Sequence, residues 1–242
     1  MDFSLQLYSI KEDTAADFDH ALGLVKKAGY SGVEFAGYYG HSAEDIKKML
    51  DGHGLKAVGA HIGIGRLKDA FDEEVMYAEA LGFKYLICPY FEFKNADDVI
   101  GVAKILEDCA AKAKQKGMIV AFHNHAQEFQ KFDGRYVLDI LFEHAPSVKW
   151  QADVYWVAYA GLDPVQVLKP YVESGRLCMI HAKEIAKDSK ENVYIGQGGI
   201  DFRALFSLCP PQDYPYIVEQ EEYTGDRFDG ICQCIKGLRA AL

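Results

Sequence analysis

Two histidines near the middle of the chain have the spacing of a ligand-binding pair. They follow the apolar run Met118–Ala121, in the order Phe122-His123-Asn124-His125. Side chains of a strand alternate between its two faces, so His123 and His125 point to the same face. Two imidazoles on one face at the end of a buried strand indicate a place where a metal ion or a substrate could bind.

Six further apolar segments end in groups that can bind a metal, a proton or a hydroxyl. Their last polar residues are Gln6 or Tyr8, Glu34, His61, Asp153, His181 with Lys183, and Glu219 with Glu221. Lys183 follows His181 by two residues and so faces the same way. The apolar segment Tyr85–Pro89, in contrast, ends without a charged residue.

Four consecutive segments, the fifth to the eighth, end in imidazole, carboxylate, imidazole and carboxylate. Mixed nitrogen and oxygen ligands suit one divalent ion, namely Mn²⁺, Co²⁺, Zn²⁺, Fe²⁺ or Mg²⁺, and the sequence does not choose among them. Such an ion polarises a carbonyl and stabilises an enediolate. Glu219, Glu221 or His125 could then move a proton at the adjacent carbon.

Each candidate also has a purely structural alternative. His61 could be a hydrogen-bonded wall residue, Asp153 could simply begin a loop, and Glu34 could pair with a lysine. Lys183 could be a surface lysine. The run Glu219-Gln220-Glu221-Glu222 could be a solvated acidic stretch, which we expect for Glu222 but not for Glu219, because charges are rarely buried without a partner.

The elements that must hold these groups are short apolar strands alternating with amphipathic helices. We expect strands at Phe3–Tyr8, Gly32–Phe35, Leu55–His61, Tyr85–Pro89, Met118–His123, Val148–Asp153, Leu177–His181 and Ile217–Glu219. Unbroken βα alternation requires parallel strands, and eight units over residues 1–242 predict a single (β/α)8 TIM barrel domain. A doubly wound open sheet would need a glycine-rich loop after its first strand, where this chain has Tyr8-Ser9-Ile10-Lys11.

The net charge and the cysteine content of the chain indicate which partners and which compartment to expect. The chain has a formal charge of −10 and 50% hydrophobic residues. This charge repels phosphate backbones and anionic lipids, so we expect no nucleic-acid or membrane partner. Six scattered cysteines without a metal-type pair, and no apolar leader or span, predict a cytoplasmic protein with reduced thiols. A homo-oligomer is compatible with the sequence, which does not specify the number of subunits.

The motifs together resemble the sugar phosphate isomerase/epimerase members of the xylose isomerase-like TIM-barrel superfamily. The resemblance covers essentially the whole chain, in the right order. The segments that carry it are Gly32-Val33-Glu34-Phe35, Ala121-Phe122-His123-Asn124-His125 with Glu128-Phe129, Asp153-Val154-Tyr155-Trp156, His181-Ala182-Lys183-Glu184, Gly196-Gln197-Gly198-Gly199-Ile200-Asp201-Phe202 and Val218-Glu219-Gln220-Glu221.

The resemblance implies one divalent metal held by groups on strands five to eight. Position by position, it assigns His123, Asp153, His181 and Glu219 as ligands. The catalytic groups would be Glu219, His125, Lys183 and Glu221, and the substrate site would include Glu34, His61, Glu128, Trp156 and Gln197.

The chain departs from the family pattern on strand five. Relatives similar to tagatose epimerases have a glutamate where this chain has His123, and a substrate-binding histidine where it has Trp156. The His-Asn-His variant also resembles inosose-dehydratase-like members. An imidazole in place of a carboxylate changes the charge of the site by one unit.

Three functions are compatible with these residues, in this order. The leading hypothesis is a metal-dependent isomerase or epimerase of a sugar, sugar phosphate or keto-polyol. The second is a lyase that removes water from an inosose or eliminates a group from a keto-glycoside. The third is a non-catalytic sugar-binding barrel. Apurinic endonucleases of the same superfamily are disfavoured by the acidic charge and the few histidines.

Overall fold

Eight parallel strands form a closed barrel in the computed structural model, which describes residues 1–242. The strands succeed one another around the barrel in the order β1-β12-β9-β8-β5-β4-β3-β2. They are β1 (Phe3–Gln6), β2 (Gly32–Phe35), β3 (Lys56–His61), β4 (Tyr85–Cys88), β5 (Ile119–His123), β8 (Lys149–Asp153), β9 (Leu177–Ala182) and β12 (Tyr216–Val218). The predicted TIM barrel is therefore confirmed.

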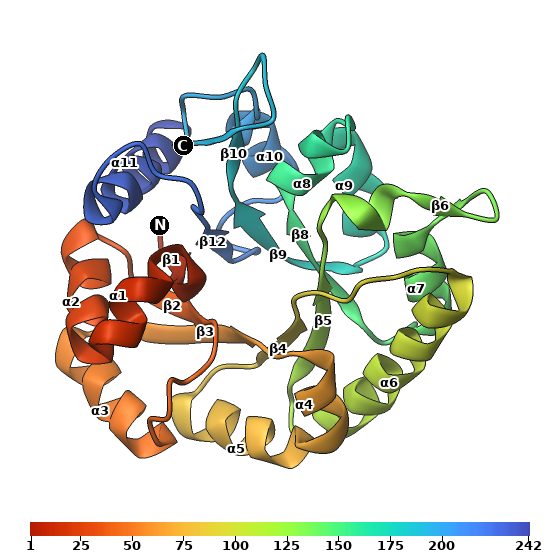
Figure 1. Cartoon of the computed structure of the whole chain (residues 1–242), viewed down its shortest axis with the longest axis horizontal. Helices are drawn as coiled ribbons and strands as arrows, with labels where there is room; N and C mark the ends of the chain where they lie inside the picture. Colours follow the sequence, from red (N-terminus) through yellow and green to blue (C-terminus); the bar gives the residue numbers. More distant parts are fainter.

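Helices surround the strands on the outside (Figure 1). They are α1 (Lys11–Ala16), α2 (Phe18–Ala28), α3 (Ala43–His53), α4 (Ile64–Asp69), α5 (Phe71–Leu81), α6 (Ala96–Gln115), α7 (Val137–His144), α8 (Val154–Tyr159), α9 (Pro164–Glu173), α10 (Phe202–Leu208) and α11 (Arg227–Ala240). Two 3-10 helices, η1 (Leu7–Ile10) and η2 (Ala126–Phe129), come after β1 and β5. No helix combines the length and apolar character that a membrane crossing requires.

The loops at the carboxyl ends of the strands hold more structure than the sequence pattern predicted. The short helices α4 and α8 come closely after β3 and β8, and two small hairpins pair β6 (Lys131–Phe132) with β7 (Arg135–Tyr136) and β10 (Glu184–Ile185) with β11 (Asn192–Val193). The helical segment between β1 and β2 is divided at Asp17, whose side chain accepts a hydrogen bond from His20 N and caps α2. Such short elements lack the repeated periods on which a prediction depends.

The barrel interior is closed below the carboxyl ends of the strands by a small apolar layer. Its members are Tyr85, Ile87, Ala121, Met179 and Ile217. A much larger cluster of 62 buried residues lies mainly between strands and helices. The next inward-facing position on a strand is two residues further on. The layer above Ala121, Met179 and Ile217 is therefore polar, and it contains the candidate site.

All six cysteines are free, and four of them are buried. Burial raises the pKa of Cys88 to about 12 and that of Cys234 to about 12. These thiols behave as small apolar side chains at neutral pH.

Candidate metal and substrate site

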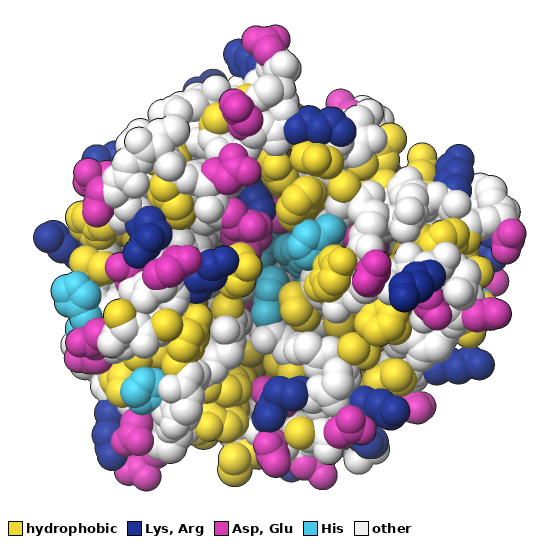
Figure 2. Space-filling model, in the orientation of Figure 1, with side chains coloured by type: hydrophobic (Ala, Val, Ile, Leu, Met, Phe, Trp, Pro, Cys, Tyr) yellow, Lys and Arg dark blue, Asp and Glu magenta, His cyan; other side chains and the backbone are white.

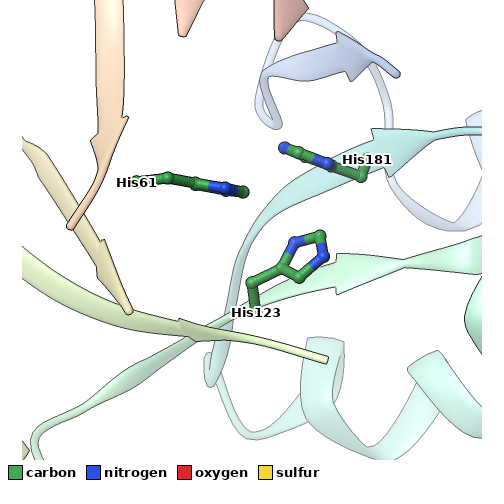
Figure 3. Close-up of side chains that lie close together, drawn as sticks. All are labelled: His61, His123 and His181. Atoms are coloured by element: carbon green, nitrogen blue, oxygen red, sulfur yellow. The ribbon is translucent and has the colours of Figure 1, made fainter. Parts of the chain in front are cut away.

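Side chains from β5, β8, β9 and the end of β12 meet above the apolar layer. One ligand atom from each of His123, Asp153, His181 and Glu219 lies within 4.8 Å of all the others, and all four residues are buried. His61, at the end of β3, forms a second such group with His123 and His181. Figure 3 shows these three imidazoles converging from three strands. Strand register explains the meeting, because Asp153 pairs with His181 across β8 and β9.

His123 has one ring nitrogen occupied and one available. Its Nδ1 lies 3.0 Å from Oε1 of Gln151, an amide oxygen that can only accept, so Nδ1 carries the proton. Its Nε2 lies 3.9 Å from Oδ2 of Asp153. Burial holds the pKa of His123 well below its usual range, and the neighbouring imidazole of His181 lowers it further. The ring is therefore neutral, with Nε2 free to bind a cation.

Asp153 divides its two oxygens between two tasks. Oδ1 accepts hydrogen bonds from Tyr155 N (2.9 Å) and Trp156 N (3.2 Å) and so caps α8. Oδ2 is buried and has no hydrogen-bond partner. Burial raises the pKa of Asp153 to about 7, although the Lys183 ammonium opposes the rise. A buried carboxylate oxygen without a partner is costly unless a cation or a donor reaches it.

His181 lies between two carboxylates. Its Nε2 is 2.6 Å from Oε1 of Glu34, and its Nδ1 is 3.3 Å from Oε2 of Glu219. Burial favours the neutral ring, but Glu34 and Glu219 outweigh it and raise the pKa of His181 to about 10. Glu34 would hold the Nε2 proton while Nδ1, on the Glu219 side, binds a cation, which is the usual support of a metal-binding histidine.

The donor set fits one divalent cation. Two imidazole nitrogens, the bare oxygen of Asp153 and the carboxylate of Glu219 supply mixed ligands and two negative charges. A cation would also give Asp153 Oδ2 the partner that it lacks. The residues that would hold the ion are therefore His123, Asp153, His181 and Glu219, while its identity is open.

Lys183 lies beside this centre and is 1% exposed. Its Nζ forms an ion pair with Glu221 and lies 4.0 Å from Oε2 of Glu219. It also lies over the ring of Trp156, 4.9 Å from the centroid. Burial alone would lower its pKa, but the carboxylates of Glu219 and Asp153 outweigh burial and hold the pKa above its usual range. The ammonium therefore stays charged. The structure thus does not support the surface-lysine alternative for Lys183.

His125 lies at the side of the site, after the end of β5. Its Nδ1 is buried and has no hydrogen-bond partner. The ring lies 5.1 Å from that of Trp156 and 5.3 Å from that of Tyr90, centroid to centroid. Burial lowers the pKa of His125 to about 4. Trp156 Nε1 is likewise buried and unpaired, so both rings offer a polar atom that the chain itself does not use.

A cavity of about 370 Å³ opens above these groups. In Figure 2 the imidazoles lie at the bottom of a central hollow, beside acidic and apolar side chains. The cavity is lined by Tyr8, Ala36, His61, Pro89, Tyr90, His123, His125, Glu219 and Glu221. A larger cavity lies elsewhere, around α9 and the loop before α10, without these groups. The smaller cavity is the candidate substrate site, because the polar groups converge there.

Four of the five predicted substrate-binding residues, Glu34, Glu128, Trp156 and Gln197, do not line this cavity. Glu34 is fully buried beneath it, where His61, His181, Gln6 and Gln151 surround the carboxylate, so it pairs with histidines rather than a lysine or a substrate. Burial raises the pKa of Glu34, but the two histidines outweigh it and lower it below the usual range.

Glu128 and Gln197 have other surroundings. Glu128 is buried, and its carboxylate accepts a 2.6 Å hydrogen bond from His125 N, which fixes the turn that carries His125. Gln197 is exposed, and its amide donates to Gln233 on α11. The loop that carries Gln197 is held by Glu184, whose carboxylate accepts hydrogen bonds from Gly196 N and Ile200 N.

Sequence reasoning missed Gln151 and Asn124. Gln151 Oε1 lies 2.8 Å from His61 Nε2 and 3.0 Å from His123 Nδ1, while its Nε2 donates to Glu34 at 2.6 Å. Asn124 Oδ1 accepts from Asp153 N at 3.0 Å and so joins β5 to β8. Gln151 lies two residues before Asp153 on a buried strand, so both side chains point to the same face. A polar residue at that inward position was the sequence feature that could have indicated its role.

The barrel and its convergent strand ends define a class of proteins, and the comparisons agree. The profile of the family described as "Xylose isomerase-like TIM barrel" matches residues 22–239. The chain belongs to this family.

Proteins similar to this chain carry the names of dehydratases and of isomerases or epimerases. The inosose dehydratase of Clostridium perfringens strain 13 is 25% identical over 88% of this chain and 84% of its own length. A sugar phosphate isomerase/epimerase structure from Parabacteroides distasonis has a TM-score of 0.84 at 23% identity, covering 99% of this chain and 94% of the other. The probable 3-DHS dehydratase of Bacillus anthracis has a TM-score of 0.73 at 14% identity, covering 99% of both chains. The two structures show a shared fold.

Proposed function

We propose that this protein is a divalent-metal-dependent isomerase or epimerase that moves a proton at the carbon next to a carbonyl of a sugar or polyol. The observation that supports the proposal most is the unpaired Oδ2 of Asp153, buried among His123, His181 and Glu219 beneath an open cavity. When bound, a divalent ion supplies a positive charge that polarises the carbonyl and stabilises the negative charge that develops on its oxygen.

The chain provides acid and base groups on two walls of the cavity. Glu219 and Glu221 come after β12, and His125 comes after β5, with β8 and β9 between these strands in the barrel. Glu221 offers a carboxylate that can take a proton from a substrate carbon. The unpaired Nδ1 of the neutral His125 can accept or return a proton from the other wall.

Lys183 orients the carboxylates and supports negative charge. Its ammonium forms the ion pair with Glu221 and lies 4.0 Å from Glu219. Because the rings of Tyr155 and Trp156 lie 4.8 Å and 4.9 Å from Nζ, water has little access to it. An ammonium held in this way can donate a hydrogen bond to a substrate hydroxyl or carbonyl oxygen beside the carboxylates.

A lyase is the second candidate. It is favoured by the relation to inosose dehydratases over 88% of the chain and by the imidazole of His123 where the epimerase pattern has a carboxylate. Both reactions begin with removal of a proton next to a carbonyl. They differ in the second step, since a lyase also expels water or an alkoxide, for which Lys183 could supply a proton.

One experiment distinguishes the three hypotheses. The protein loaded with Mn²⁺ is incubated in D₂O with ketoses, inososes and keto-glycosides, and the products are weighed by mass spectrometry. We expect one deuteron to enter the substrate carbon, and we expect the chelator-treated protein to be inactive. An isomerase or epimerase otherwise conserves mass, whereas loss of water identifies a lyase. If no substrate takes up deuterium and none loses water or an alcohol, the enzyme proposal is overturned.

Glu219→Gln tests the site within the same assay. We expect the deuterium uptake rate to fall at least about a hundredfold, since the site loses both a ligand charge and a carboxylate. Glu222→Gln is the matched control, because Glu222 lies three residues away and is exposed. Equal activity of the two variants would exclude Glu219 from the site.

A further inference from the structure

A second cavity adjoins the candidate substrate site. Its volume is about 540 Å³, and it shares Ala36 and His61 with the first cavity. It lies over the loop after β2 and the start of α4. Its lining is Ala36, Gly37, Tyr38, Tyr39, Gly40, His61, Ile62, Gly63, Arg66, Glu73, Glu74 and Tyr77.

Aromatic rings form much of this second cavity. Tyr38 and Tyr77 stack with their planes 6° apart and their centroids at 4.0 Å. Their hydroxyls are fixed, that of Tyr38 on Glu74 (3.1 Å) and that of Tyr77 on His41 O (2.9 Å). Rigid aromatic walls with a few oriented polar groups are typical of small-molecule sites, and they suit the apolar faces of sugar rings.

The loop that lines the cavity is held in a conformation that costs energy. Tyr39 has a φ of 51°, which is uncommon for a residue with a side chain, and Gly37 and Gly40 on either side have φ values of 95° and 82°. Tyr39 as a whole remains 38% exposed. Backbone strain beside an exposed aromatic ring is found at binding loops, where the conformation serves the ligand.

The charges of the two cavities disfavour an anionic ligand. Arg66 is the single lysine or arginine among their lining residues. Its guanidinium is already paired with the buried Glu74 and, at 3.0 Å, with Glu73. The second cavity therefore carries one more negative than positive side chain, which repels a phosphate group, while arginine and carboxylate groups can still hydrogen-bond to hydroxyls.

We propose that the cavity between the Gly37–Gly40 loop and Gly63 is a second subsite for an uncharged sugar unit, so that the substrate is a neutral glycoside of at least two units rather than a sugar phosphate. This inference rests on the proposed function, because the reacting unit would occupy the first cavity. It is carried by the shared wall, the stacked tyrosines and the paired guanidinium.

Gly63 provides a steric test. It lines the second cavity, a Cβ there would meet no atom within 4 Å, and its φ of −58° suits any residue. Gly63→Phe would therefore fill the subsite without straining the backbone. Gly65→Phe is the matched control, since Gly65 is also free of neighbours within 4 Å but does not line the cavity.

Binding is measured by calorimetry on the Mn²⁺-loaded protein with glucose, glucose 6-phosphate, trehalose, maltose, cellobiose and gentiobiose. We expect at least one disaccharide to bind ten times more tightly than glucose, and glucose 6-phosphate to bind no more tightly than glucose. In Gly63→Phe that disaccharide should bind no more tightly than glucose does. The affinity for glucose itself should differ less than twofold between this variant and the unmodified protein. Gly65→Phe should behave as the unmodified protein.

Several outcomes would overturn the inference. They are tighter binding of glucose 6-phosphate than of glucose, no disaccharide that exceeds glucose, and equal effects of the two glycine variants. If Gly63→Phe fails to fold, saturation-transfer NMR on the unmodified protein decides, because both rings of the disaccharide must then receive saturation from the protein. These experiments measure binding, whereas deuterium exchange measures catalysis. A failure of the subsite inference can therefore be distinguished from a failure of the proposed function.

Discussion

Two buried carboxylates of this barrel, Asp153 and Glu184, have opposite surroundings. Both are almost inaccessible, at 0% and 1% exposure. Glu184 Oε1 accepts from Ile185 N (3.1 Å) and Ile200 N (3.0 Å), and its Oε2 accepts from Gly196 N (3.2 Å). Asp153 satisfies one oxygen in the same way but leaves the other without a partner. Glu184 is therefore part of the scaffold, and Asp153 is part of the candidate site.

The two carboxylates differ in one observation that separates a candidate functional group from a structural one. Burial raises the pKa of both groups, so the direction of the shift does not distinguish them. The hydrogen-bond partners do, because native proteins satisfy nearly all buried polar atoms and an exception needs an explanation. Asp153 Oδ2 is such an exception, and it faces the free nitrogen of His123 at 3.9 Å.

The largest expected effect is that of Asp153→Asn. Asparagine keeps an oxygen to cap α8 but replaces Oδ2 by an amide nitrogen, which cannot bind a cation. We therefore expect the metal content to fall below about a tenth of that of the unmodified protein, and turnover to fall about a thousandfold. Metal is measured by mass spectrometry after dialysis. Asp163→Asn is the control, since Asp163 caps α9 through Val165 N and Gln166 N. Full metal content in Asp153→Asn would remove the contrast with Glu184.

Gln151→Leu should weaken metal binding by about 10- to 100-fold, as is common when the partner of a metal-binding histidine is lost. The variant removes the acceptor that fixes the proton on His123 Nδ1. Affinity is measured by competition with a chelating dye. Gln6→Leu is the control, because Gln6 also donates to Glu34, at 2.7 Å, without contacting His123. Unchanged affinity would show that packing alone orients His123.

Gly198→Ala should act on stability rather than on metal binding. A Cβ there would lie 2.1 Å from Ile185 O and 2.5 Å from the Glu184 side chain, so we expect a loss of about 3 kcal/mol in the free energy of unfolding. Gln197→Ala, one residue away and exposed, should change it by less than about 0.5 kcal/mol. Both are measured by urea denaturation. A large loss of activity in Gln197→Ala alone would restore its predicted substrate role.

The smallest expected effect concerns Glu128, a third buried carboxylate to set beside Asp153 and Glu184. Burial raises its pKa from 4.5 to about 7. Its protonated form therefore contributes stability that is complete below about pH 4.5 and is lost as the pH rises through about 7. Relative to Glu128→Gln, the unmodified protein should lose about 2 kcal/mol between pH 5 and pH 8. A constant difference across that range would mean that Glu128 stays ionised.

The pattern of the chain predicted the barrel and most of its centre. Period-two alternation placed His123, His181 and Glu219 two residues beyond the inward-facing Ala121, Met179 and Ile217, and the structure has them there. This succeeded because the direction of a side chain on a strand is a local property. The resemblance added the role of each position, including the substitution on strand five.

The pattern did not give the partners of side chains that meet across long stretches of the chain. Glu34 and Gln151 meet across 117 residues, and Glu34 and His181 across 147. Gln197, which the resemblance assigned to the substrate site, is exposed on a loop whose backbone binds Glu184.

By itself the sequence determined the alternation of strands and helices and the polar residue at each strand end, since both depend on local periodicity. Only the tertiary structure decided which of those polar atoms are already paired. That depends on barrel closure and register, which bring Asp153 beside His181 and leave its Oδ2 free while enclosing Glu34 completely. A residue type says what a group can bind, and its surroundings decide whether anything is left for it to bind.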